Sequence, residues 1–205
     1  MLKIYLTRHG QDLDNEQGIL NGHRDQPLSA IGQNQARQLA SFIKQSGVVF
    51  TAVYSSPLQR AYQTALSVTT ELEMPEPIIE PLLIERDFGV LGGQKVLDIP
   101  KLCFPNILET EKITYFLKAS GAESFPDLIV RAKKLIKKIK DKHQDGNILL
   151  VGHGDFGKMI YAAYYDLPWE SVLRSFHFGN SDLILLDDKA DPEDLKIFNN
   201  QQFNS

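Results

Sequence analysis

The stretch Leu2-Lys3-Ile4-Tyr5-Leu6-Thr7-Arg8-His9-Gly10 opens the chain with an apolar and aromatic run that ends abruptly at an arginine, a histidine and a glycine. This pattern predicts a short strand over residues 2–7 that leads into a turn. An arginine–histidine–glycine turn often occurs by chance and is usually only a loop. A functional interpretation of this turn is favoured here because similar strand-to-turn junctions occur twice more along the chain.

The second junction follows a predicted strand over residues 48–54, where Ser55-Ser56-Pro57 lead into a helix with Arg60 in its first turn. The third follows a buried-type strand over 147–151, where the chain continues as Gly152-His153-Gly154. Parallel strands end at one edge of a sheet and ligands bind there, so we expect the three junctions to meet at that edge. Two guanidinium groups, backbone N–H groups and glycines suit a phosphate. A histidine in such a site indicates phosphoryl transfer through its ring.

The rest of the chain alternates between helical and strand patterns. Helices are predicted over 29–46, from a capping box at 56–59 to about 73, over 127–142 and over 155–165, and further strands over 78–79, 183–186 and 195–198. Residues 85–124 look irregular, with one helix near 110–118; a hairpin turn is expected across 189–193, and residues 199–205 are expected to fray. The alternation predicts one α/β domain over residues 1–205, with a mostly parallel sheet covered by helices on both faces.

Composition narrows the class of protein. The chain has 205 residues and a net charge of −4, which argues against a nucleic-acid partner. No apolar run approaches the length of a membrane span, and the apolar N-terminal run is too short for a signal peptide. A single cysteine, Cys103, excludes an intrachain disulfide and fits a reducing compartment. We therefore expect a soluble cytoplasmic protein with no membrane or nucleic-acid partner; its oligomeric state stays open, with a dimer as one option.

Several groups of residues, in family order and spacing, resemble the histidine phosphatase superfamily, in the branch related to cofactor-dependent phosphoglycerate mutase. They are residues 6–11 with Asn15, 21–29 with Gly32, Gln35 and Ala36, 55–61 with Thr64, 83–89, 123–125 with Asp127 and Arg131, and 151–154. The resemblance implies a three-layer α/β/α sandwich. We expect residues at about 86–124 to set substrate specificity, because this segment is irregular and follows Glu85.

The resemblance further implies a covalent mechanism without a metal or other cofactor, acting on a small phosphorylated metabolite. His9 would take the phosphoryl group, while Arg8, Arg60 and His153 stabilise its charge. Glu85 would protonate the leaving oxygen and then activate water. The residues expected to bind substrate are Asn15, Asn21, Gly22, His23, Arg86 and Gly154.

The family contains both phosphatases and mutases, and the sequence favours a phosphatase. Mutases carry extra cationic residues and a tail that shields the site from water. Arg86 matches one outer arginine, but residues 96–121 contain no arginine and the tail after Phe198 is brief and polar. The scarcity of cations in this segment favours a monoester with an uncharged or partly apolar leaving part. Phosphoglycerate mutase-type transfer remains the first alternative.

Two remoter alternatives come from other classes. His9, Asp12, Asp14, His153 and Asp155 are residue types that bind a divalent metal, although the neighbouring arginines would repel it. The second of these alternatives is an inactive regulatory domain. The complete set of matched residues argues against it. Asp12 and Asp155 depart from what an anion site needs, unless Asp12 points away from the phosphate.

Overall fold

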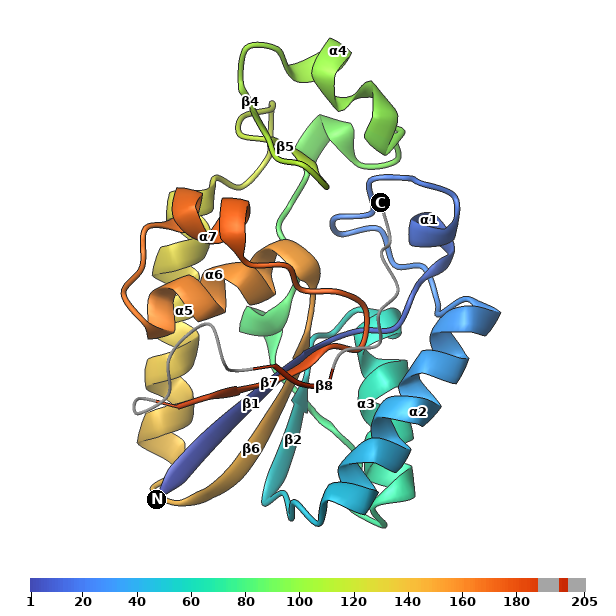
Figure 1. Cartoon of the computed structure of the whole chain (residues 1–205), viewed down its shortest axis with the longest axis vertical. Helices are drawn as coiled ribbons and strands as arrows, with labels where there is room; N and C mark the ends of the chain where they lie inside the picture. Colours follow the sequence, from blue (N-terminus) through green and yellow to red (C-terminus); the bar gives the residue numbers. More distant parts are fainter. Residues whose placement is uncertain (188–195, 199–205) are drawn as a thin grey trace.

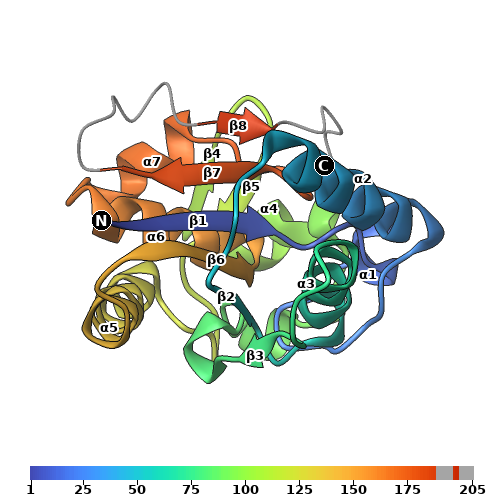
Figure 2. The same ribbon diagram turned by 90° about the horizontal axis from the view of Figure 1, so that it is seen from below.

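A computed structural model of the chain describes residues 1–187 and 196–198. The described residues form a six-stranded sheet in the order β3-β2-β6-β1-β7-β8 (Figure 2). The strands are β1 (Leu2–Arg8), β2 (Ala52–Ser55), β3 (Ile78–Ile79), β6 (Gly146–Gly152), β7 (Leu183–Leu186) and β8 (Lys196–Phe198). The first four in space are parallel, whereas β7 runs antiparallel to β1 and β8 antiparallel to β7. The sheet is therefore mostly parallel, as predicted.

Helices cover both faces of this sheet (Figure 1). On one face lie α2 (Ala30–Ser46) and α3 (Gln59–Glu71); on the other lie α5 (Phe125–Lys142) and α6 (Gly154–Tyr164). Successive side chains of a strand point to opposite faces of the sheet. In β1, Tyr5 packs with α2 and α3, whereas Ile4 and Leu6 pack with α5 and α6 on the other face. The three-layer α/β/α fold class is confirmed.

A segment above the carboxyl edge of the parallel strands forms a small layer of its own. It contains 3₁₀ turns at Gly89–Leu91 and Val96–Asp98, the helix α4 (Ile99–Cys103), and a hairpin of β4 (Ile107–Glu109) and β5 (Thr114–Phe116). Another 3₁₀ turn, Pro81–Leu83, precedes it. Its buried core consists of Phe88, Leu91, Ile99, Cys103 and Phe116, which pack with Leu20 from the loop after α1. We call residues 86–124 the cap segment.

The helix predicted near 110–118 is wrong, because the chain makes the β4–β5 hairpin there. The Thr110 hydroxyl accepts the N–H of Ile113 and donates to its carbonyl, which closes a tight turn. The β-branched and aromatic residues that follow favour a strand over a helix.

Several predicted element starts also differ from the structure. The strand predicted from residue 48 begins only at Ala52, and helix α3 begins at Gln59 with no side-chain cap, so the expected capping box is wrong. A true capping box starts α5, where Ser124 and Asp127 exchange hydrogen bonds. Three short helices of the described residues were not predicted, namely α1 (Leu13–Glu16), α4 and α7 (Trp169–Ser175).

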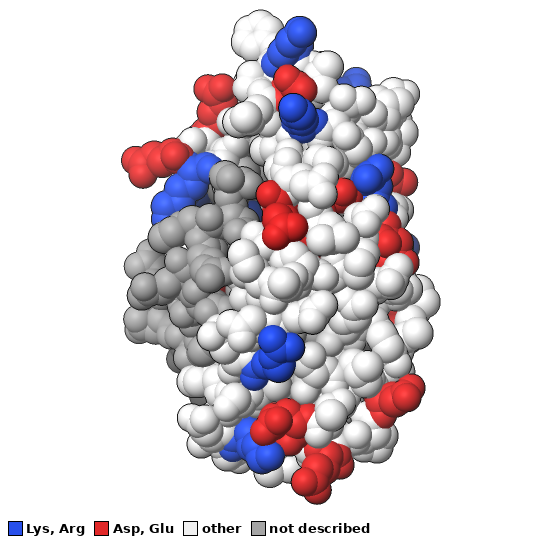
Figure 3. All heavy atoms as spheres, turned by 90° about the vertical axis from the view of Figure 1, so that its right-hand side faces the viewer, with Lys and Arg blue, Asp and Glu red and all other residues white. Residues whose placement is uncertain are grey.

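The hairpin turn expected across 189–193 and the fraying expected over 199–205 lie outside the described residues. Within the described residues, no helix is long and apolar enough to cross a membrane. Acidic and basic side chains are interspersed on the face that carries α2 (Figure 3).

Candidate active site

The three predicted junctions meet at the carboxyl edge of the parallel strands. Arg8 at the end of β1 is in register with Gly152 at the end of β6, and the next residue, His9, donates its N–H to the Gly152 carbonyl at 3.0 Å. On the other side of β6, the Ser56 N–H donates to Val151 at 3.0 Å. Backbone pairing thus places the two histidines side by side, with ring centroids 5.1 Å apart.

His9 is almost wholly buried, and its ring is held in one tautomer. Its Nδ1 lies 2.6 Å from the Gly10 carbonyl, which can only accept, so we assign the ring proton to Nδ1. Its Nε2 accepts from Arg60 Nε at 3.2 Å. Burial, together with the charges of Arg60 and Arg8, lowers the pKa of His9 well below its usual value. The ring is therefore neutral, with its lone pair on Nε2.

A contact between two glycines positions the turn that carries His9. Gly10 lies against the backbone of Gly32 in the first turn of α2, and a Cβ on Gly32 would collide with the Gln11 carbonyl. The Gly10 N–H donates to the Thr64 hydroxyl at 3.1 Å, and the Gln11 N–H donates to Gln35 at 2.7 Å. The matched residues of α2 and α3 are thus the support of this turn.

Arg60 is completely buried and fixed at each end. Its Nη1 donates to the Arg24 carbonyl at 2.7 Å and its Nη2 to the Gly22 carbonyl at 2.8 Å. Its Nε lies 3.1 Å from Asp12 Oδ2. Asp12 also accepts from the Asn15 N–H and from Asn21 Nδ2, each at 2.7 Å. The acid that looked unfavourable in the sequence therefore orients the arginine beside His9.

Two buried polar atoms near His9 have no hydrogen-bond partner among the described residues: Arg8 Nε and His153 Nδ1. Arg8 is anchored by its Nη1, which donates to the Phe178 carbonyl at 3.2 Å. His153 Nε2 lies 2.7 Å from Ser56 Oγ, which accepts from the Leu58 N–H and can donate its own proton to the ring. This assignment leaves the ring proton on Nδ1, so both unpartnered atoms are donors. Burial and the charge of Arg60 hold the pKa of His153 well below its usual value.

Glu85 lies at the N-terminus of α6. Its Oε1 accepts from the Arg86 and Phe156 N–H groups at 2.8 and 2.9 Å, and its Oε2 lies 3.3 Å from the Asp155 N–H. Burial, with a smaller contribution from the charge of Asp155, raises the pKa of Glu85. A buried carboxyl with a raised pKa suits a proton donor.

Arg86 connects the cap segment to helices α5 and α6. Its guanidinium packs over the Phe116 and Phe125 rings and donates to the Glu123 and Phe116 carbonyls at 2.8 and 2.9 Å. Its Nη1 also lies 3.4 Å from Asp155 Oδ2. Its Nη2 is buried and has no partner among the described residues.

A cavity of about 130 Å³ lies between this edge of the sheet and the cap segment. Its polar wall includes Arg8, Asn15, Asn21, Glu85, Arg86 and Gly154. Its apolar wall includes Ile19, Leu20, Phe88, Val96, Ile99 and Phe116. Pockets for drug-sized ligands measure about 300–1,000 Å³, so this one suits a small metabolite.

Two further residues expected to bind substrate, Gly22 and His23, lie behind this wall. Gly22 has a positive φ of 49°, and a Cβ there would lie 2.9 Å from the Phe88 ring. His23 donates from Nε2 to the Glu85 carbonyl at 2.8 Å, and its side chain is 37% exposed. Both therefore support Arg60 and Glu85 from outside the cavity wall.

The ligand set of the metallohydrolase alternative is not assembled. Asp12 is paired with Arg60, Asp14 with Arg24 at 2.8 Å, and Asp155 with Arg86. Three carboxylates thus face three different arginines instead of one shared point.

Sequence reasoning missed three residues at this site. Ser56, expected to cap a helix, contacts His153 instead. Asn180 donates from Nδ2 to the His9 carbonyl at 2.8 Å, from a segment that has no motif of its own. Lys158 lines the cavity from α6, where its helical position hid it among apolar neighbours.

The comparisons with known proteins agree with this geometry. The sequence pattern of the histidine phosphatase superfamily, branch 1, matches residues 4–201. The chain belongs to the histidine phosphatase superfamily. This confirms the resemblance, and with it the expectation of a phosphoric monoester hydrolase.

Curated members of the superfamily match most of the chain. A Hydrogenobacter thermophilus protein named "Putative phosphoserine phosphatase 2" is 34% identical over 88% of this chain and 87% of its own length. A 2,3-bisphosphoglycerate-dependent phosphoglycerate mutase from Methylobacterium is 29% identical over 82% of this chain and 83% of its own. A solved mycobacterial glucosyl-3-phosphoglycerate phosphatase is 24% identical, covers 90% of this chain and 92% of its own, and superposes with a TM-score of 0.77, which shows the shared fold.

Proposed function

We propose that this histidine phosphatase hydrolyses a small phosphomonoester through a phosphohistidine on His9, without a metal ion. The observation that carries the proposal is the pair of unpartnered buried donors, Arg8 Nε and His153 Nδ1, around a histidine whose lone pair is on Nε2. Buried donors without acceptors are costly, and phosphoryl oxygens would satisfy them.

In the first step, His9 Nε2 attacks phosphorus while the ester P–O bond breaks. The leaving oxygen takes a proton from Glu85, whose pKa is raised by burial. Arg8, Arg60 and His153 hold the non-bridging oxygens. A phosphate oxygen takes over the Arg60 Nε–H that otherwise faces the His9 lone pair.

In the second step, water attacks the phosphohistidine as its P–N bond breaks. Glu85, now ionised, accepts the proton of the water, and phosphate and neutral His9 are released. Each step leaves the site in the protonation state that the next one needs. The arginines supply the charge stabilisation that a metal would otherwise provide.

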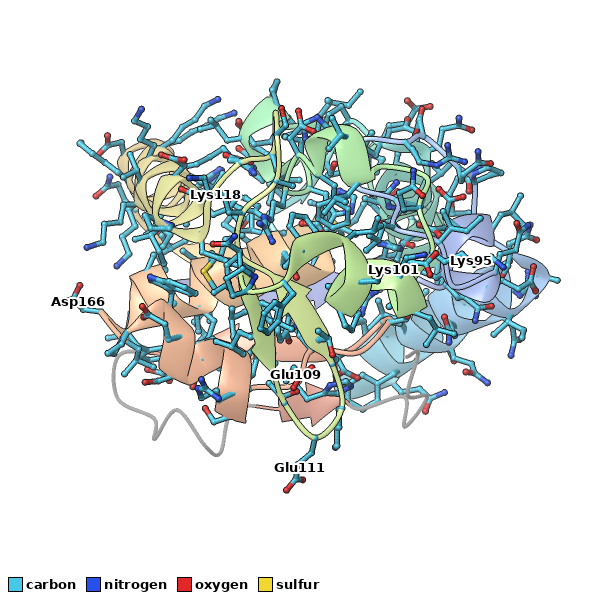
Figure 4. All side chains as sticks on the ribbon, turned by 90° about the horizontal axis from the view of Figure 1, so that it is seen from above. Lys95, Lys101, Glu109, Glu111, Lys118 and Asp166 are labelled. Carbon is cyan, nitrogen blue, oxygen red and sulfur yellow. The ribbon has the colours of Figure 1, made fainter. Side chains whose placement is uncertain are left out.

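Phosphoglycerate mutase-type transfer is the second candidate, supported by the mutase relative and by Arg86 at the cavity. The lysines of the cap segment do not strengthen it. Lys95, Lys101, Lys112 and Lys118 are exposed and do not line the cavity. Figure 4 labels Lys95, Lys101 and Lys118 on the outer surface of the segment.

Two assays on one sample test the proposal, each run with and without EDTA. One measures phosphate release from a panel of phosphomonoesters that includes phosphoserine; the other measures interconversion of 3- and 2-phosphoglycerate. Release without interconversion is the expected result. Interconversion without release would establish the mutase, and activity that EDTA abolishes would contradict the metal-independent route.

A further inference from the structure

Asp12 adds a negative charge, as well as a hydrogen bond, to the contacts that orient Arg60. The two Nη groups of Arg60 donate to the Gly22 and Arg24 carbonyls at 2.8 and 2.7 Å, which fixes the plane of the guanidinium. Asp12 Oδ2 lies 3.1 Å from Arg60 Nε, and both side chains are completely buried. A buried ion pair is often no more stabilising than a well-packed apolar pair. Stability alone therefore does not account for this carboxylate.

The charge of Asp12 is separable from its structural contacts. The loop that supplies the two carbonyls is anchored independently, because Asp14 accepts two hydrogen bonds from the Arg24 guanidinium, at 2.8 and 3.2 Å. Asp12 also caps helix α1 by accepting the Asn15 N–H at 2.7 Å. An uncharged serine hydroxyl can cap a helix in the same way. Removal of the charge therefore leaves the main supports of Arg60 in place.

Asp12 is ionised in this arrangement. It accepts from the Asn15 N–H, from Asn21 Nδ2 and from Arg60 Nε. Burial raises the pKa of Asp12, and the charge of Arg60 opposes that rise. Because each of these partners is a donor, a protonated carboxyl would find no acceptor for its own O–H among them.

The Asp12 carboxylate lies close to the place where the proposed phosphoryl group binds. Arg60 Nε is 3.1 Å from Asp12 Oδ2 and 3.2 Å from His9 Nε2, the atom that attacks phosphorus in the proposed reaction. The same N–H thus stands between the carboxylate and the nucleophile. A phosphate that takes this N–H comes close to a buried negative charge, where little water screens the repulsion.

We infer that Asp12 offsets the charge of Arg60 and thereby weakens the binding of phosphate, so that the product leaves after each turnover. The inference rests on the proposed function, because it concerns the product of that reaction at the same site. Arg8 and Arg60 both act on His9 with their charges, and Asp12 cancels the nearer part of that charge. Asp12 acts through Arg60 and is a positioning residue. A site that binds substrate and product too tightly gains nothing in turnover.

Competitive inhibition by inorganic phosphate measures this effect directly. Asp12→Ser removes the charge and keeps a hydroxyl that can cap α1. With p-nitrophenyl phosphate as the substrate, we expect its Ki for inorganic phosphate to be about tenfold or more below that of the wild type, because a like charge at this range has an effect of that size. Asp12→Asn, which is closer in size, should lower the Ki as well. A purely structural role predicts the reverse, because a displaced Arg60 would bind phosphate less tightly.

Asp14→Asn is the matched control. Asp14 lies two residues after Asp12 and is also buried and paired with an arginine, but that partner, Arg24, is 42% exposed. Water screens the charge of this pair. Its loss should therefore leave the Ki for phosphate unchanged or raise it. A fall in Ki as large as that of Asp12→Ser would overturn the inference.

Stabilisation by phosphate gives a second measurement that does not depend on activity. A ligand that binds only the folded protein raises its Tm, and the rise grows with affinity at a fixed ligand concentration. We expect the rise in Tm at one phosphate concentration to be larger in Asp12→Ser and Asp12→Asn than in the wild type, whatever their Tm without phosphate. An equal or smaller rise in both variants would overturn the inference.

The outcomes distinguish the role of Asp12 from the proposed function. If the wild type hydrolyses p-nitrophenyl phosphate and inorganic phosphate competes, but the Asp12 variants leave the Ki unchanged or raise it, only the role of Asp12 is wrong. If the wild type hydrolyses no ester, or if hydrolysis does not depend on His9, the proposed function itself fails.

Discussion

At the scale of single residues, the proposed reaction needs His9 as an unprotonated nucleophile and Glu85 as a protonated acid. Burial and neighbouring arginines lower the pKa of His9 well below its usual value, whereas burial raises the pKa of Glu85. These opposite shifts have one cause, the loss of water around each group, and each favours the uncharged form. A neutral nucleophile and a protonated acid are the two states that phosphoryl transfer needs at the same time.

Glu85→Gln tests this division through pH and leaving group. The amide oxygen can still accept from the Arg86 and Phe156 N–H groups, so the local structure should remain. In the wild type, kcat/KM should fall as pH rises through the raised pKa of Glu85, because the proton is lost; in the variant this decline should disappear. For alkyl esters, kcat/KM should drop about 10²–10⁴-fold, with a much smaller loss for p-nitrophenyl phosphate. Equal losses for alkyl and aryl esters would show that Glu85 is not the acid.

At the scale of elements, the site depends on how closely the His9 turn approaches helix α2. Gly10 and Gly32 make a contact of backbone on backbone, and Gln35 binds the next N–H of the turn. This contact explains why residues far from the phosphate site share the pattern that carries the family resemblance. For the substitution Gly32→Ala, this contact and helix propensity predict opposite effects on stability.

Gly32→Ala should destabilise the protein although alanine is the better helix former. Propensity alone predicts a gain of about 1 kcal/mol, but the new Cβ would collide with the Gln11 carbonyl. We expect a loss of at least about 2 kcal/mol in the free energy of unfolding, measured in urea, and a matching loss of activity. Gly92→Ala is the control, since its Cβ would meet only a carbonyl at 3.5 Å, and it should change stability by less than about 0.5 kcal/mol. A Gly32→Ala protein as stable as wild type would refute the close contact.

At the scale of the whole molecule, the sheet and the cap segment contribute different halves of the cavity. The sheet edge brings the phosphate-binding groups together, and the cap segment lies above that edge (Figure 1). Phe88, Val96, Ile99 and Phe116 of the cap segment give the cavity an apolar wall. Lys158 and Tyr115 join the two halves across the cavity.

The part of the candidate site that follows from local sequence pattern was predicted. Arg8, His9, Arg60 and His153 stand at the ends of strands or starts of helices, so the parallel-sheet rule alone placed them together. Glu85 needed the family resemblance, because a glutamate after a short strand is otherwise an ordinary surface residue.

The rest of the candidate site depends on contacts between distant segments and could not be predicted. Lys158 resembles an ordinary helix residue until β5 is seen to cross above it, and β5 itself was predicted as helix. Asp12 appeared unfavourable because its partner, Arg60, is 48 residues away in the chain. No local periodicity carries that information.

The most direct test of the central claim is to trap the phosphoryl group on the enzyme. The Glu85→Gln variant, mixed with p-nitrophenyl phosphate in EDTA and quenched in alkali, should accumulate it because the variant lacks the base for the water step. We predict a burst of one p-nitrophenol per site and a phosphorylated peptide that contains His9, with neither in the same variant carrying His9→Asn. Phosphate on His153, or phosphate release with no phosphohistidine at any time, would contradict the account.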